Sequence, residues 1–222
     1  MKKLLSLFLF SMTLCFASAQ TTDNMLWTAV QVQKDVTKKL MLSLDVEARF
    51  DQNVSRLRSA FGQFEIYWKF NKYLATSIDY RYGGKQSEKL SEFSKGHRLS
   101  FFVYGKYKYK RFTLSDRIGY FNQYLVNALA DKVNPQKYFR NKTQLKYELT
   151  RKLAPFVYFE FFYRVSGNKQ EVDQNRFAGG FDFDFNKKHN VKLQYIYLTD
   201  VNVKIKNKDI RNIISAGYTF KF

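Results

Sequence analysis

Apolar and polar residues alternate along most of this sequence, and this alternation constrains the fold more than any other feature. In the clearest example, residues 40–50, every second residue is apolar while Ser43, Asp45, Glu47 and Arg49 lie between them. A period of two places successive side chains on opposite faces of a β-strand. After residue 19, no stretch shows a useful helical period or an apolar run of the roughly 20 residues that a membrane helix needs. The sequence therefore predicts an all-β chain.

Alternating segments recur along the whole chain, separated by polar turn residues, as expected for consecutive strands. Single-chain bacterial barrels contain an even number of strands, so we expect either ten, with the irregular first segment outside the wall, or twelve, with one strand overlooked. Asp116 shares a face with Leu114 and Ile118, which predicts a bulge or a wrong register in its segment. The candidate segments number eleven: residues 25–34, 40–50, 57–70, 74–83, 97–109, 112–121, 139–149, 156–165, 176–185, 191–198 and 210–222.

Connections between these segments alternate in length. Short turns at Asn71, Lys110, Thr150 and Asn186 alternate with longer polar connections at 51–56, 84–96, 122–138, 166–175 and 199–209. Outer-membrane barrels have short periplasmic turns and longer extracellular loops. A soluble barrel is also up-and-down, but it places its apolar face inward, where few charges are tolerated. A membrane barrel accommodates both an apolar face and a face rich in charged residues. We therefore predict one antiparallel up-and-down transmembrane β-barrel of ten to twelve strands, with its C-terminus on the periplasmic side.

The two ends of the chain predict where it is delivered. Residues 1–19 read as a cleaved secretory signal peptide, with a basic start, an apolar run from Leu4 to Phe16 and an A-x-A cleavage site, so residues 20–222 form the barrel domain. The one cysteine, Cys15, lies in the removed segment. These features predict the outer membrane of a Gram-negative bacterium. The last strand resembles the terminal signal that the barrel-insertion machinery reads, and its assembly residues are Gly217, Tyr218, Phe220 and Phe222.

Facing the polar residues inward gives a charged lumen. With a formal net charge of +19 on the whole chain, we predict a narrow passive channel that favours small anionic solutes. A lumen packed with ion pairs remains the competing prediction, because barrels of intermediate size are neither fully filled nor widely open. We expect Arg140 and Lys142 to line the outer mouth. The candidate lumen residues are Asp45, Glu47, Arg49, Asp79, Arg81, Arg98, Arg140, Lys142, Arg164 and Arg176, with further inward charges at Arg117, Glu160, Asp182, Lys192 and Arg211.

Other chemistry is sparsely represented. His97 and His189 map to opposite ends of the barrel, and no metal-ligand cluster, cofactor motif or catalytic constellation is recognised, so we predict no enzyme, metal or cofactor. Export argues against nucleic acid as the partner of the basic surface. Outer-membrane lipid and lipopolysaccharide are the expected neighbours. One alternative is a non-conducting barrel whose basic residues Lys204, Lys206, Lys208 and Arg211 bind lipopolysaccharide or a partner, and a more distant one is a lipid-modifying enzyme centred on His97.

Aromatic residues near the predicted strand ends fall on the apolar face and predict two interfacial girdles rather than sugar-binding platforms. These residues are Phe50, Trp68, Phe70, Tyr80, Tyr82, Tyr107, Tyr109, Tyr195, Tyr197, Phe220 and Phe222.

Several short motifs resemble the domain-of-unknown-function 2490 family of small outer-membrane barrels. They are Trp27 and the stretches 44–50, 79–83, 97–99 and 217–222, which together extend over most of the chain after the signal segment. The resemblance implies a barrel, and it implies no particular activity.

Overall fold

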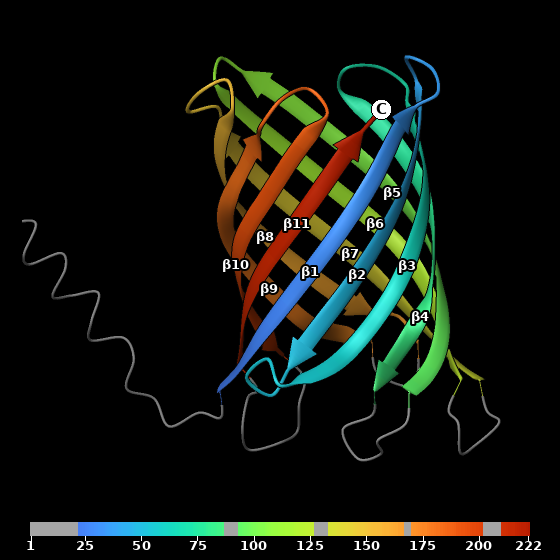
Figure 1. Cartoon of the computed structure of the whole chain (residues 1–222). Coiled ribbons are helices and arrows are strands. Elements are labelled where there is room, and N and C mark those ends of the chain that lie inside the picture. Colours follow the sequence, from blue (N-terminus) through green and yellow to red (C-terminus); the bar gives the residue numbers. More distant parts are fainter. Residues whose placement is uncertain (1–21, 87–92, 127–132, 167–169, 202–209) are drawn as a thin grey trace, which may run out of the picture.

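The computed structural model describes residues 22–86, 93–126, 133–166, 170–201 and 210–222, and the predicted signal peptide lies outside this part of the chain. Within it, the chain is built from strands (Figure 1). Their bounds are β1 (Thr22–Asp35), β2 (Leu40–Asp51), β3 (Arg56–Lys69), β4 (Leu74–Gln86), β5 (Phe93–Tyr109), β6 (Phe112–Val126), β7 (Val133–Tyr147), β8 (Leu153–Arg164), β9 (Glu171–Asp184), β10 (His189–Asp200) and β11 (Ile210–Lys221).

No helix in the described ranges is long and apolar enough to cross a membrane.

The strands form a closed barrel in chain order, with antiparallel neighbours throughout and one parallel pair, β1 with β11, closing the wall. The predicted barrel of ten to twelve strands is confirmed, with eleven strands in the described ranges. Only the even-number rule, which favoured ten or twelve, does not hold, because the first segment is a regular strand. With an odd number of strands the first and last run in the same direction, so their pairing must be parallel. Trp27 lies opposite Ser215 and Leu26 opposite Ile214, which keeps inward and outward residues in phase across this junction.

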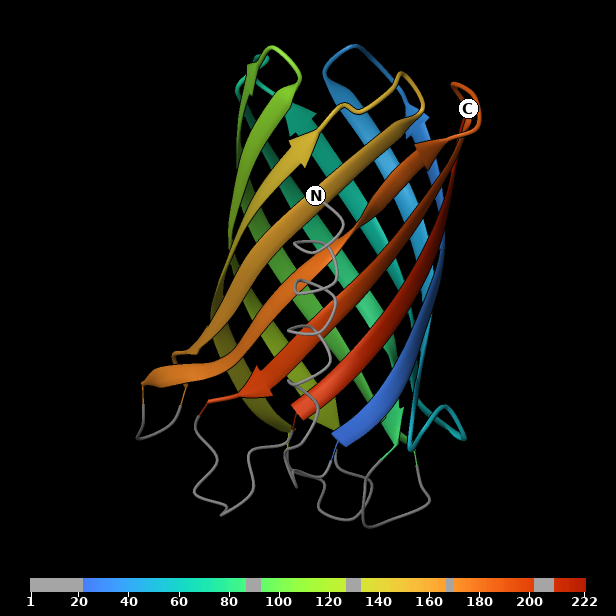
Figure 2. The same cartoon turned by 90° about the vertical axis from the view of Figure 1, so that its left-hand side faces the viewer.

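The two ends of the barrel differ as the sequence predicts. The C-terminus and the short turns lie at one end, and the strand ends that flank the longer connections lie at the other, where β1 begins (Figures 1 and 2). We call these the turn end and the loop end. Side-chain acceptors build the turns: Asn71 Oδ1 accepts the backbone N–H groups of Tyr73 and Leu74 at 2.8 and 2.9 Å. Asn186 and Thr150 cap their turns in the same way.

The outer surface of the barrel is apolar. Val46 is 58% exposed and Ile214 is 62% exposed, although both belong to regular, fully paired strands. Large apolar side chains that are exposed in this way around a closed wall suit contact with lipid rather than water. The predicted girdle residues Trp68, Tyr80 and Tyr107 are also exposed on this surface.

Asp116 is an exception on the apolar surface, and the predicted bulge around it was wrong. β6 pairs with β5 and β7 without interruption, so Asp116 stays in phase with Leu114 and Ile118 and faces outward. Its carboxylate accepts hydrogen bonds from Asn141 Nδ2 at 3.0 Å and from Thr143 Oγ1 at 2.7 Å. These partners on β7 satisfy the carboxylate locally, which makes a bulge unnecessary. The register instead shifts elsewhere, at Arg49/Phe50 and at Phe162/Tyr163.

Candidate functional site

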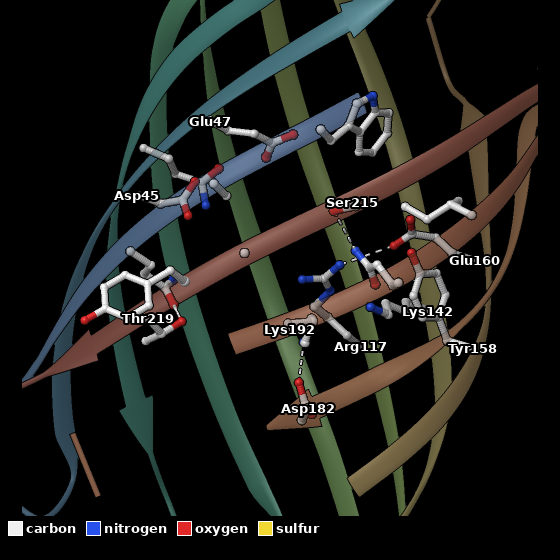
Figure 3. Close-up of a pocket in the computed structure, with 18 of the residues that line it drawn as sticks. Asp45, Glu47, Arg117, Lys142, Tyr158, Glu160, Asp182, Lys192, Ser215 and Thr219 are labelled. Carbon is white, nitrogen blue, oxygen red and sulfur yellow. Dashed lines mark hydrogen bonds and ion pairs between the residues drawn. The ribbon is translucent and has the colours of Figure 1, made fainter. Parts of the chain in front are cut away.

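The candidate site is a cavity of about 570 Å³ inside the barrel. It extends from Thr219 and Lys221 at the turn end to Trp27 and Arg98 deeper in the lumen. Its wall carries ten basic and six acidic residues, so the lining has a basic excess. Figure 3 shows side chains from both sides of the barrel converging on this space, among them Asp45, Glu160 and Asp182.

Nine of the ten candidate lumen residues line this cavity. The other, Arg164, lies beyond it toward the loop end, where its guanidinium pairs with Asp173 at 2.5 Å. Arg140 and Lys142 lie in the middle of β7, opposite Phe162 and Glu160, rather than at the outer mouth as expected. The sequence placed them too far out because it counted β7 as starting at residue 139, whereas the strand begins at Val133.

Glu160 is the centre of the main ion-pair cluster. Its carboxylate lies 2.7 Å from Arg140 Nε, 3.2 Å from a terminal nitrogen of Arg117 and 3.2 Å from one of Arg176. The residue is only 1% exposed. Register explains the convergence, because Arg176 lies directly opposite Glu160 on β9, while β6 and β7 supply the other two arginines from the opposite side. One buried carboxylate thus holds three guanidinium groups together.

A second cluster lies nearer the turn end. Asp182 pairs with Lys146, and its other carboxylate oxygen lies 3.6 Å from Lys192 Nζ (Figure 3). Two lysines thus share one acid, which again leaves the local charge positive.

Aromatic rings project inward between these charges and were missed by the sequence reasoning, which assigned aromatics to the lipid face. The rings of Trp27, Phe61, Phe102, Phe121 and Phe162 form what we call the arginine–aromatic layer, because each lies under at least one guanidinium group. The signal was present in the phase of the pattern: these rings share a face with charged or amide residues of the same strand. The stacking arginines are Arg49, Arg81, Arg98, Arg117, Arg140 and Arg176.

Gly119 makes room for this layer. A Cβ atom at Gly119 would lie 2.1 Å from the ring of Phe102, which is itself only 1% exposed. The lumen is therefore packed with side chains at this level.

Besides the exposed Lys221 at the turn end, three cations of the cavity wall lack an acidic partner in the described ranges. Within the described ranges, no carboxylate oxygen lies within 4.0 Å of a side-chain nitrogen of Arg81, Arg98 or Lys142. Lys142 Nζ instead lies 3.6 Å from the ring centroid of Tyr158. Arg81 Nε donates to Gln63 Oε1 at 2.9 Å. These cations add to the positive charge that the two ion-pair clusters leave in the lumen.

The two histidines lie at opposite ends of the barrel. His97 faces outward near the loop end, opposite Tyr82 and Tyr124. The centroids of the His97 and Tyr124 rings lie 5.4 Å apart. His189 lies at the turn end, where Nδ1 is 2.5 Å from the hydroxyl of Tyr218. No group of three or more His, Cys, Asp or Glu residues in the part that the structure describes is arranged to hold a metal.

The predicted assembly residues occupy the closing strand. Tyr218 and Phe222 are exposed on the outer surface, while Gly217 faces the lumen, where a Cβ would meet no atom within 4 Å. The Phe222 backbone N–H donates to the Gln33 carbonyl at 3.1 Å, so the final residue bonds across the junction to β1. The ring of Phe222 also stacks with that of Phe220 at 5.7 Å.

The proposed basic loop behaves differently from expectation. Lys204, Lys206 and Lys208 lie outside the described residues. Arg211 belongs to β11 and faces inward, with its guanidinium 2.7 Å from Asp200, so it is not part of a loop surface.

The closed wall, the apolar outer surface and the charged lumen define a small transmembrane β-barrel. The chain belongs to the family described as protein of unknown function DUF2490, whose model matches residues 24–207. The NanC porin has a similar fold, with a TM-score of 0.55 and 11% identity over 90% of this chain and 99% of that one. The translocator domain of the autotransporter NalP from Neisseria meningitidis gives a TM-score of 0.48 and 11% identity, covering 75% and 70% of the two chains. Comparison with curated proteins finds no match.

Proposed function

We propose that this protein is a narrow diffusion pore in the outer membrane of a Gram-negative bacterium and that it favours small anionic solutes. The observation that carries the proposal is the presence of Arg81, Arg98 and Lys142 in the lumen without acidic partners. Rings of Arg and Lys select for anions in pores. The basic excess of the cavity wall supports the same sign of selectivity.

The arginine–aromatic layer supports a small conductance. Phe102 and Glu160 are each 1% exposed, so ions must pass between packed side chains rather than through a wide aqueous channel. The same packing favours the second candidate, a non-conducting barrel that serves as a structural or interaction protein beside lipopolysaccharide. A lipid-modifying activity at His97 gains no support, because tyrosines rather than a serine lie directly opposite this residue.

Reversal potentials in planar bilayers under a KCl gradient test the pore. We expect a small, stable conductance that prefers chloride. Lys142→Glu should shift the reversal potential toward potassium, because Lys142 lines the cavity and has no acidic partner to lose. Lys72→Glu makes the same change in net charge in the turn between β3 and β4 and serves as the matched control.

A folded barrel without conductance would overturn the pore proposal in favour of the non-conducting barrel. A potassium preference in the wild type would show that the paired acids, rather than the unpaired cations, control passage. Both outcomes are read from the same recordings.

A further inference from the structure

Arg81 and Arg98 form an unusual pair within the lumen wall. They lie directly opposite each other on β4 and β5, with side chains on the same face. Gln63 lies opposite Arg81 on the other side, and Gln123 lies opposite Arg98. Like charges directly opposite on neighbouring strands destabilise a sheet. A neutral amide on each side does not compensate this repulsion.

The contacts of the pair leave its charge without a counterion. Both guanidinium groups approach one oxygen, Gln63 Oε1, at 2.9 Å from Arg81 and 3.5 Å from Arg98. Arg98 Nε is buried and has no hydrogen-bond partner in the described structure, and neither has the buried hydroxyl of Ser100 two residues further on. A buried donor without a partner costs free energy, so the site favours a group that supplies acceptors.

Neighbouring acids are engaged elsewhere or too distant to act as partners. Glu47 pairs with Arg49 at 2.5 Å. Asp79 accepts hydrogen bonds from Ser77 at 2.7 Å and from Gln63 at 3.2 Å. Asp45 lies on β2 directly opposite Gln63, and it forms no ion pair within 4.0 Å in the described structure. These acids moderate the local potential without occupying the guanidinium donors.

Both arginines also line a second, smaller cavity. Its volume is about 140 Å³, and it shares only Arg49, Arg81 and Arg98 with the larger cavity. Its other lining residues, including Gly96 and Gln123, lie toward the loop end of β5 and β6. The arginine pair therefore stands between two spaces and is accessible from each.

We propose that Arg81 and Arg98 form a discrete, saturable binding site for a small oxyanion, a carboxylate or a phosphate-type group, at the boundary between the two cavities. Planar guanidinium groups bind such oxygens in pairs through parallel N–H donors. Arg81 Cζ lies 3.6 Å from the ring centroid of Phe61, and Arg98 Cζ lies 4.9 Å from that of Phe121. These stacking contacts hold the two guanidinium groups in place. The inference deepens the proposed function and rests on it, since solutes must enter the lumen to reach the pair.

Binding can be measured without conduction. Purified, detergent-folded protein is titrated with sodium phosphate and, separately, with sodium acetate at constant ionic strength in a chloride background, by calorimetry and by thermal unfolding. We expect saturable heat and a ligand-dependent rise in Tm for at least one of the two ions, because a ligand that binds only the folded state stabilises it. Phosphate binding alone, acetate binding alone or both would each support the site and identify its ligand chemistry.

Variants distinguish binding by direct contact with Arg81 and Arg98 from attraction by the overall positive charge of the cavity. Arg81→Gln and Arg98→Gln should each weaken binding at least about tenfold through the loss of charge-assisted donors. Lys192→Gln removes one cation from the same larger cavity but leaves the pair intact, so its affinity should stay near that of the wild type. Arg98→Lys, which retains the charge and loses the fork, should also weaken binding and replaces Arg98→Gln if that variant does not fold.

No saturable binding of either ion would overturn the proposal. Equal weakening by Lys192→Gln, or no weakening in the Arg81 and Arg98 variants, would overturn it as well. The pore proposal fails separately: a folded protein that binds an oxyanion but carries no current retains the site and loses the pore.

Discussion

Single residues determine how charge is tolerated inside this barrel. Glu160 is almost fully buried and is held by Arg117, Arg140 and Arg176, so its negative charge compensates part of the repulsion among three cations. Removing one partner of a buried ion pair leaves an uncompensated charge, which is more damaging than the absence of the whole pair. Glu160 is thus a structural residue of the lumen, whereas Arg81 and Arg98 are available to a solute.

Glu160→Ala should lower the free energy of unfolding by about 3–5 kcal/mol, the usual cost of breaking a buried pair. Urea unfolding of the protein in lipid vesicles measures this loss. Glu148→Ala is the control, because Glu148 pairs with Lys108 at 2.6 Å in an exposed position. Exposed pairs contribute at most about 1 kcal/mol. Equal losses for the two variants would contradict the role assigned to Glu160.

Asn141→Leu should destabilise the barrel although it adds apolar surface on the lipid side. The substitution removes a donor of Asp116 and leaves this carboxylate partly unsatisfied on an apolar wall. The double variant Asp116→Leu with Asn141→Leu should recover most of the loss, because both partners are then apolar. The same unfolding experiment tests this as a double-mutant cycle. Additive effects of the two substitutions would show that the hydrogen bond contributes nothing.

At this scale the sequence predicted the direction of a side chain better than its partners. The period of two placed Asp45, Arg98 and Lys142 on the inner face, and the structure locates all three on the cavity wall. Which cation meets which acid depends on register between strands that are distant in sequence, and no single-sequence pattern carries that information. The rings of the arginine–aromatic layer were missed for another reason. An aromatic side chain can face either the lipid or the lumen of a membrane barrel, so its residue type alone does not predict its direction.

At the scale of elements, the closing pair of strands is the feature that departs from expectation. The sequence pattern predicted eleven segments, and the described ranges contain eleven strands. The error came from the general rule of even strand numbers, which discounted the weak alternation of β1. That alternation is weak because the apolar residues Met25, Trp27 and Ala29 lie on the inner face of β1, while polar Thr28 shares the outer face with Val30. Parallel pairing with β11 nevertheless satisfies its backbone along twelve residue pairs.

Cysteine cross-linking tests the parallel junction. Thr28 and Ala216 are partners in the β1–β11 register. Neighbouring strands lie within the Cα spacing that a disulfide needs. Thr28→Cys combined with Ala216→Cys should therefore cross-link under mild oxidation, visible as a mobility shift that reductant reverses. The sequence after residue 19 contains no other cysteine to interfere.

Asn24→Cys combined with Ala216→Cys is the matched control for this junction. Asn24 pairs with Asn212 and is out of register with Ala216, so the two thiols should remain free. Efficient cross-linking of the control, with none in the first pair, would refute the register.

Deleting Phe222 should reduce the amount of folded protein in the outer membrane. The deletion removes a backbone hydrogen bond to Gln33 and a ring that lies 4.9 Å from Lys34 Nζ, both at the closing junction. Membrane fractionation and protease resistance measure the loss. Lys187→Ala is the control, since Lys187 lies in the turn between β9 and β10 and outside the closing junction. Normal levels of the deletion variant would remove Phe222 from the assembly signal.

For the whole molecule, the separation of charge from lipid decides what the barrel can do. The outer surface is apolar, and a cavity of about 570 Å³ inside the barrel has more basic than acidic residues on its wall. The Glu160 and Asp182 clusters each hold more cations than acids, and the unpartnered cations of the cavity wall add to this positive charge. The sequence predicted the sign of the lumen charge. The volume of the cavity and the packing of the arginine–aromatic layer depend on side-chain contacts across the barrel, which composition and periodicity do not specify.

The salt dependence of selectivity separates the two ways in which this lumen can act on anions. The net field of the cavity wall acts over a distance and is screened as the Debye length falls from about 10 Å at 0.1 M salt to about 3 Å at 1 M. Direct contact with Arg81 and Arg98 acts at hydrogen-bond distance and is screened much less. We therefore expect the chloride preference of the wild type, measured as a reversal potential under a fixed KCl ratio, to weaken at high salt. Block of the current by phosphate or acetate should persist under the same conditions and disappear in Arg98→Gln. A chloride preference that is unchanged at 1 M salt would show that contact, rather than the field of the cavity, controls selectivity.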